Sequence, residues 1–135
     1  MADAQVGALQ AKLQTSTIAF QKIEQELSTV IEARQRLDSQ LSENEQVLKE
    51  FASLKSHNTV YKLVGPSLMP QDSAEAKQNV EKRLDYIRNE ISRVEAQLKE
   101  VQDRATKKKE EIIALQQQFQ SLQGPSAAAG RPVSA

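Results

Sequence analysis

Apolar residues in the first half of the chain recur at alternating intervals of three and four, from residue 6 to residue 51. This spacing places them along one stripe of an α-helix, as in a coiled coil. The stripe consists of Val6, Leu9, Leu13, Phe20, Ile23, Leu27, Val30, Leu37, Leu41, Leu48 and Phe51, interrupted by Ser16, Arg34 and Asn44. We therefore predict one long helix over about residues 4–54.

A second stripe with the same spacing runs from residue 80 to residue 122. Its members are Val80, Leu84, Ile87, Ile91, Val94, Leu98, Val101, Ala105, Ile112, Leu115, Phe119 and Leu122, with the polar Lys108 among them. Asp72 and Glu75 have the spacing of a capping box, which marks the start of a helix. The pattern predicts a second long helix over about residues 72–123.

The end of the second helix carries its own signal, because Gly124 and Pro125 together form a typical stop. The remaining residues are mostly Ala, Gly, Pro and Ser, a composition that cannot build a core. We predict one domain over residues 1–123 and a disordered tail over residues 124–135.

Each narrow stripe is stable only against a partner helix, and the nearest partner is the other half of the same chain. Pairing Leu27 with Val101 aligns the two stripes in antiparallel orientation, and a shift of one heptad in either direction also aligns them. Flanking charges favour the first register, which brings Glu26 near Arg104 and Asp38 near Arg88, although it also brings Glu45 near Glu81. The predicted fold is mainly α, a long antiparallel two-helix coiled coil.

The segment between the helices breaks the heptad period. Thr59–Val64 is rich in β-branched and aromatic residues, and Gly65–Pro66 signals a turn. Ser67–Met69 is interpreted as a short returning strand that ends at Pro70. We predict a β-hairpin over about residues 59–70 at the fold-back end of the coiled coil.

Both faces of this hairpin carry apolar side chains. Tyr61 and Leu63 share one face, while Val60 and Val64 share the other. A two-stranded hairpin alone is marginal in water, and its unpaired edges can recruit other strands. The predicted subunit-assembly residues are Val60, Tyr61, Leu63, Val64 and Leu68. The alternative is a connector that packs on the helix ends.

The composition limits the chemistry of the chain. Lys+Arg and Asp+Glu are both 18, so the formal net charge is zero and nucleic acid is not an expected partner. There is no cysteine, and one histidine, His57, cannot form a metal or nucleophile cluster. The basic run Lys107–Lys109 is interpreted as a solvated helix face. We expect no enzyme activity and no cofactor.

The expected location is the cytoplasm. Met1–Gln10 lacks the basic and apolar regions of a signal peptide. No stretch approaches the ~18 apolar residues that a membrane span requires. The lack of cysteine fits a reducing compartment.

Several short motifs around the hairpin resemble those of prefoldin β-class subunits. They are Val60-Tyr61-Lys62-Leu63-Val64-Gly65-Pro66, Gln71-Asp72, Glu75-Ala76, Asn79-Val80-Glu81-Lys82-Arg83-Leu84 and Tyr86-Ile87. The resemblance implies a heterohexamer in which this chain joins two α-class and three further β-class subunits. Such hairpins assemble into β-barrels, from which coiled coils extend. The resemblance also implies that the tips hold unfolded actin and tubulin without ATP and deliver them to the cytosolic chaperonin.

Two apolar residues, Ile18 and Ile113, fall outside the stripes toward the predicted open end of the coiled coil. Scattered surface apolar residues are common. Together with residues at the helix ends, however, they form a candidate client-binding set, which is Val6, Leu9, Ile18, Ile113, Phe119 and Leu122. The alternative function is a structural coiled-coil adaptor in a tethering or cytoskeletal complex.

Overall fold

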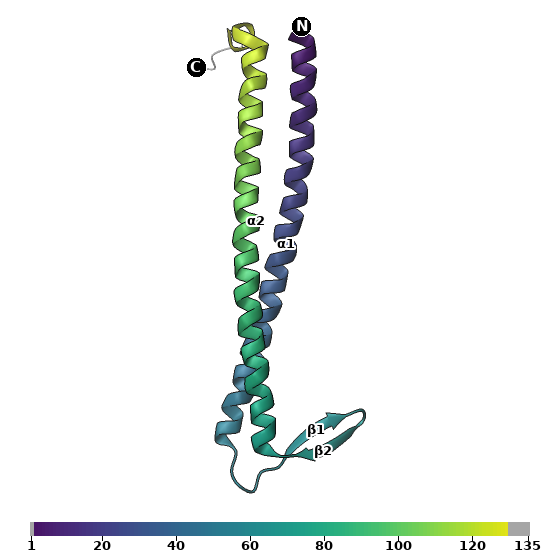
Figure 1. The fold of residues 1–135 in the computed structure, drawn as a ribbon, viewed down its shortest axis with the longest axis vertical. Helices are drawn as coiled ribbons and strands as arrows, with labels where there is room; N and C mark the ends of the chain where they lie inside the picture. The colour runs from purple at the N-terminus through teal and green to yellow at the C-terminus, as the bar shows by residue number, and fades with distance from the viewer. Residues whose placement is uncertain (1, 130–135) are drawn as a thin grey trace. The chain divides into compact units, whose positions relative to one another are not determined.

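The computed structural model describes residues 2–129, which form two long helices joined by a β-hairpin (Figure 1). The elements are α1 (Ala2–Ser53), β1 (Val60–Val64), β2 (Ser67–Gln71) and α2 (Ser73–Ala129). The predicted fold class is confirmed, since both apolar stripes are helical and the segment between them forms an antiparallel pair of strands.

The chain divides into two units, of which unit 1 is built from two stretches that are distant in sequence and unit 2 from one continuous stretch. Unit 1 comprises residues 1–29 and 98–135, so it contains the first part of α1 and the last part of α2. Unit 2 comprises residues 30–97, which include the rest of α1, the hairpin and the first part of α2. Within each unit the two helices lie side by side with opposite directions (Figure 1).

The buried side chains belong mainly to the apolar stripes. In unit 2, the buried stripe residues are Val30, Leu84, Ile87, Ile91 and Val94. In unit 1, the described buried residues are Val101 and Ser16, whereas the other stripe residues of that unit are mostly half-buried. The predicted stripes therefore form the helix contact, and they bury more side chains in unit 2 than in unit 1.

One ion pair between the helices of unit 1 agrees with the register that pairs Leu27 with Val101. In unit 1, Arg104 Nη2 lies 2.6 Å from Glu26 Oε1, as predicted. A shift of one heptad would displace these groups by about 10 Å along the helix, too far for contact. The predicted register is therefore present in this unit.

The second predicted ion pair does not form. Arg88 lies 3.7 Å from Glu45 instead of contacting Asp38, and Asp38 pairs with Arg34 of its own helix. Arg34 lies one helical turn before Asp38, so its long side chain reaches the Asp38 carboxylate on the same helix. Glu45 therefore has a cationic partner in Arg88, whereas the predicted register places it near the like-charged Glu81.

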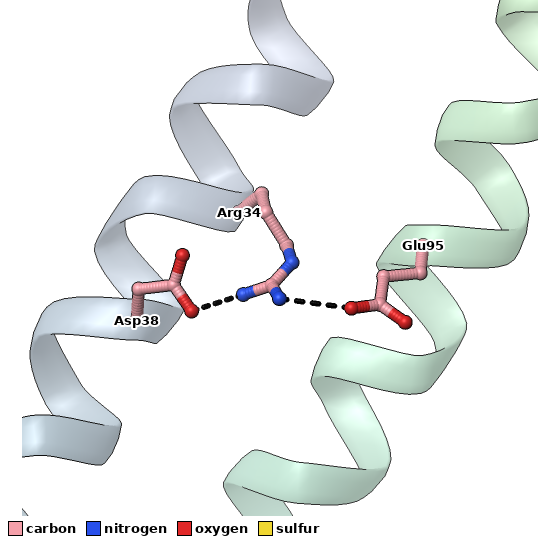
Figure 2. A network of polar contacts seen from close by, with 3 residues as sticks. All are labelled: Arg34, Asp38 and Glu95. Carbon is pink, nitrogen blue, oxygen red and sulfur yellow. Dashed lines mark hydrogen bonds and ion pairs between the residues drawn. The ribbon is translucent and has the colours of Figure 1, made fainter.

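Arg34 interrupts the apolar stripe of α1 and forms a polar cluster in unit 2 (Figure 2). Its guanidinium donates to Asp38 on α1 and, at 2.8 Å, to Glu95 on α2. The hydrogen bond to Asp38 is the main reason that the pKa of Arg34 is raised above its ordinary value, and the bond to Glu95 adds to this effect. Arg34 thus links the two helices through a charged group at a position where most heptads place an apolar side chain.

Helix α2 begins where the sequence predicts and extends further than predicted. The carboxylate of Asp72 accepts a hydrogen bond from the Glu75 backbone N–H at 3.1 Å, which caps the first turn. At the other end, α2 continues through Gly124 and Pro125 to Ala129. A proline removes one backbone hydrogen bond, and the alanines that follow have the highest helix propensity. Residues 130–135 of the predicted disordered tail lie outside the described residues.

The register can be tested by cysteine crosslinking in unit 1, because the natural chain has no cysteine. Leu27→Cys combined with Val101→Cys should form an intramolecular disulfide rapidly under mild oxidation. Phe20→Cys with Val101→Cys, and Leu27→Cys with Lys108→Cys, represent the two shifted registers. These controls should crosslink slowly, since a heptad shift of about 10 Å exceeds the ~7 Å limit for a disulfide. Faster crosslinking in either control, measured by gel mobility, would contradict the register.

Candidate assembly and client-binding surfaces

The hairpin is a regular antiparallel pair closed by a two-residue turn. Val64 pairs with Ser67 on either side of Gly65 and Pro66, and the pairing continues to Val60 with Gln71. Gly65 has a φ of 58°, a conformation that strains residues with a side chain. A positive φ at the first turn position with proline at the second fits a type II′ turn, whose twist matches that of the strands. The Gly65–Pro66 signal thus fixes the register of the hairpin.

Strand β2 is longer than the sequence predicts, because it continues through Pro70 to Gln71. In a hairpin with a two-residue turn, the pair beside the turn exchanges hydrogen bonds and the next pair does not. Counting from Val64 and Ser67, the pair of Tyr61 with Pro70 is one that exchanges none. Pro70 therefore removes no hydrogen bond from the hairpin, and the prediction that it ends the strand is wrong.

One face of the hairpin is entirely apolar. Residues that pair directly share a face, so Tyr61, Leu63, Leu68 and Pro70 lie together. The exposed fractions of Tyr61, Leu63 and Leu68 are 55%, 70% and 65%. Moving a leucine side chain from full exposure to full burial is worth about 1.5–3 kcal/mol, so burying the exposed part of Leu63 or Leu68 would contribute more than half of that. Three of the five predicted assembly residues thus lie on a single exposed apolar surface, which we call the Tyr61 face.

The opposite face of the hairpin is mixed and lies partly against the helices. Val64 and Met69 are exposed there, whereas Val60 is half-buried. Val60 and Lys62 line a hollow of about 560 Å³ together with Val47, Phe51, Tyr61, Gln71, Ala76, Asn79, Val80 and Arg83. The base of the hairpin therefore packs near the end of α1 and the start of α2, as the connector alternative predicts, while its outer part does not. Met69 is not among the predicted assembly residues. The alternation of side chains along Ser67–Met69 nevertheless places it on the other face of the hairpin from Leu68.

All six predicted client-binding residues lie in unit 1. Leu9 and Leu122 line the same groove, which has a volume of about 440 Å³ and is completed by Gln5, Ala8, Lys12, Gln118 and Ser121. Val6 and Phe119 are half-buried on the stripe. The structure thus brings two of the six residues together in one groove between the helix ends. The other residues that line the groove are small or polar, so the apolar pattern of the sequence did not indicate them.

Ile18 and Ile113 are exposed, with fractions of 47% and 44%, but they do not line this groove. They also do not line the neighbouring hollow of about 680 Å³, whose walls include Ser16, Lys108 and Glu111. Lys108 is held at this hollow by an ion pair of 2.9 Å with Glu111, while Lys107 and Lys109 are exposed. Ile18 and Ile113, which lie outside the apolar stripes, are therefore surface residues separate from the groove.

The described part of the chain is residues 2–129. Within that range, no three His, Cys, Asp or Glu side chains are grouped closely enough to hold a metal ion. No helix among the same residues combines the length and the apolar character that crossing a membrane requires. His57 is exposed in the connector between α1 and β1.

Comparison with known proteins gives one consistent result for the sequence. A family model described as "Prefoldin subunit" matches residues 8–119. Prefoldin subunit 6 of Homo sapiens is 42% identical over 121 residues, which cover 90% of this chain and 94% of the human protein. Prefoldin subunit 6 of Arabidopsis thaliana is 39% identical over 129 residues, covering 96% of this chain and 100% of the plant protein.

Comparison with solved structures agrees at the level of the fold. The crystal structure of the prefoldin beta subunit from Thermococcus strain KS-1 matches with a TM-score of 0.70. The match covers 90% of this chain and 95% of the archaeal chain, at 19% sequence identity. The helix–hairpin–helix arrangement is therefore shared by proteins whose sequences have diverged widely.

Proposed function

Because the chain belongs to the prefoldin subunit family, we propose that it is one subunit of an ATP-independent heterohexameric chaperone. Its partners would be two α-class and three further β-class subunits of that family. The complex would hold unfolded proteins, notably actin and tubulin, and pass them to the cytosolic chaperonin. The proposed location is accordingly the cytoplasm.

The observation that carries this proposal is the exposed Tyr61 face on a hairpin of two strands. Such a hairpin has too little buried surface to be stable alone. Tyr61, Leu63 and Leu68 are more than half exposed, and Val64 and Met69 are exposed on the other face. Contact with hairpins of other subunits would bury the exposed side chains of both faces. The hairpin is thus the proposed site of assembly.

Client holding is assigned to the surface of unit 1. The groove with Leu9 and Leu122 and the exposed Ile18 and Ile113 offer several small apolar contacts. Unfolded chains expose many apolar segments, so weak and adaptable contacts suffice when several subunits act on one client. Half-buried stripe residues such as Val6 and Phe119 become available when the terminal turns open, because those turns lack part of their backbone hydrogen bonding.

An aggregation assay with the reconstituted complex tests the proposed function. The chain is mixed with the other five kinds of subunit, and the complex is purified by size. Denatured actin is then diluted into buffer without ATP, and light scattering is followed. We expect the complex to suppress scattering and to release actin to added chaperonin. A complex that forms but leaves scattering unchanged would contradict the chaperone function and favour a structural role.

A further inference from the structure

The two outer edges of the hairpin offer different backbone groups to a partner strand. In an antiparallel pair, residues that exchange no hydrogen bonds with each other direct their N–H and C=O groups outward. In this hairpin those residues are Tyr61 and Leu63 on β1 and their partners Pro70 and Leu68 on β2. These four residues therefore form the outer edges.

The outer edge of β1 presents a full set of backbone donors and acceptors, while the outer edge of β2 lacks one donor. Tyr61 and Leu63 each present one N–H donor and one C=O acceptor. On β2, Leu68 presents both groups, but Pro70 has no N–H and presents its C=O alone. Proline on an outer edge is a recurrent means by which proteins discourage strand pairing.

Lys62 does not block the β1 edge, although a lysine on an edge strand can do so. Lys62 pairs with Met69 in a position that exchanges hydrogen bonds within the hairpin, so its backbone groups face β2. By strand alternation its side chain stands on the face opposite Tyr61, and Lys62 is one of the residues that line the hollow beside the helices. The β1 edge thus keeps four outward backbone groups and an apolar face.

We infer that the outer edge of β1 is the principal edge through which this chain pairs with a strand of another subunit, and that the β2 edge is the weaker junction. The inference rests on the proposed assembly function and specifies which strand carries it. The occupant is an antiparallel strand of a different prefoldin-family subunit. It needs non-proline residues opposite Tyr61 and Leu63, and apolar side chains there, because directly opposed residues share a face.

A matched pair of proline variants tests the inference. Leu63→Pro removes the outward N–H of β1, and Leu68→Pro removes the outward N–H of β2. Leu63 and Leu68 lie directly opposite each other on the same face, and both are highly exposed, so the two changes are comparable. Neither removes a hydrogen bond within the hairpin, as Pro70 already illustrates at the same kind of position.

Alanine variants separate the backbone from the side chain. Leu63→Ala and Leu68→Ala shorten the side chains and keep both N–H groups. Each variant is mixed with the other family subunits and an equal amount of tagged wild-type chain. The fraction incorporated into the purified complex is measured by mass spectrometry, and circular dichroism of each free chain checks that the helices are intact.

We expect Leu63→Pro to incorporate about tenfold less than Leu63→Ala, the cost of leaving one interface acceptor without its donor. Leu68→Pro should differ from Leu68→Ala by less than about twofold, because pairing at the β2 edge is already weakened. Equal losses at both edges, a larger loss at Leu68 or no loss at either would overturn the inference. The free chain could also pair with a second copy of itself. If Leu63→Pro abolishes such pairing, the partner strand belongs to a second copy, and the stated partner is overturned. If the wild-type chain does not incorporate, the proposed function itself fails.

Discussion

Replacing Leu63 with Asp should remove the chain from the hexamer while leaving its helices folded. Leu63 is the most exposed of the large apolar side chains in the hairpin, at 70%, and lies on the Tyr61 face. If assembly buries that face, an unpaired carboxylate there costs several kcal/mol, equivalent to roughly a hundredfold or greater loss of affinity. The free chain does not bury Leu63, so its helicity should be unchanged. Native mass spectrometry and circular dichroism measure the two properties.

A change at the neighbouring position controls for the added negative charge, because Lys62→Asp makes the net charge more negative by two and Leu63→Asp makes it more negative by one. Lys62→Asp alters the neighbouring residue on the opposite face, which already carries a charge. Its effect on assembly should be much smaller than that of Leu63→Asp. Normal incorporation of Leu63→Asp into the hexamer would refute the Tyr61 face as an assembly surface. Loss of helicity would show instead that the hairpin supports the fold of the free chain.

The sequence predicts the hairpin well because its turn has a specific conformational requirement. Gly65 followed by Pro66 suits a turn with a positive φ at its first position, and the residues before it alternate in the manner of a strand. The predicted end of β2 at Pro70 is wrong because residue type alone does not decide whether a proline interrupts a strand. Whether a proline breaks a strand depends on which way its missing N–H would point, and that follows only from the register.

The helices were predicted from the heptad stripes, but side-chain pairing was predicted less completely. Glu26 and Arg104 meet as expected. Asp38 instead pairs with Arg34 on its own helix, because a partner one turn away competes with a partner across the interface. Such choices depend on rotamers rather than on spacing. The groove between Leu9 and Leu122 is likewise a product of packing, since small and polar residues form much of its wall.

Replacing Ile18, Ile113 and Leu122 together with glutamine should weaken client holding without affecting assembly. The three side chains lie in unit 1 and are exposed by 47%, 44% and 39%. Glutamine keeps a good helix propensity and adds no charge, so α1 and α2 should remain helical. Under the proposed function, each residue would contribute a weak apolar contact to an unfolded chain, and several subunits would act on one client. We therefore expect the altered complex to be required at about twofold or higher concentration for equal suppression of aggregation.

The control is a triple variant with exposed apolar residues in unit 2, Ile31→Gln, Leu54→Gln and Tyr86→Gln. It replaces three large hydrophobic side chains that are also partly exposed but leaves unit 1 unchanged, so holding of denatured actin should stay near the wild-type level. Both complexes are compared by light scattering after native mass spectrometry has confirmed six subunits. Equal holding by the wild-type and the unit 1 variant would show that this surface does not grip clients. The adaptor function would then account better for a complex that assembles normally and exposes this apolar surface but does not hold unfolded proteins.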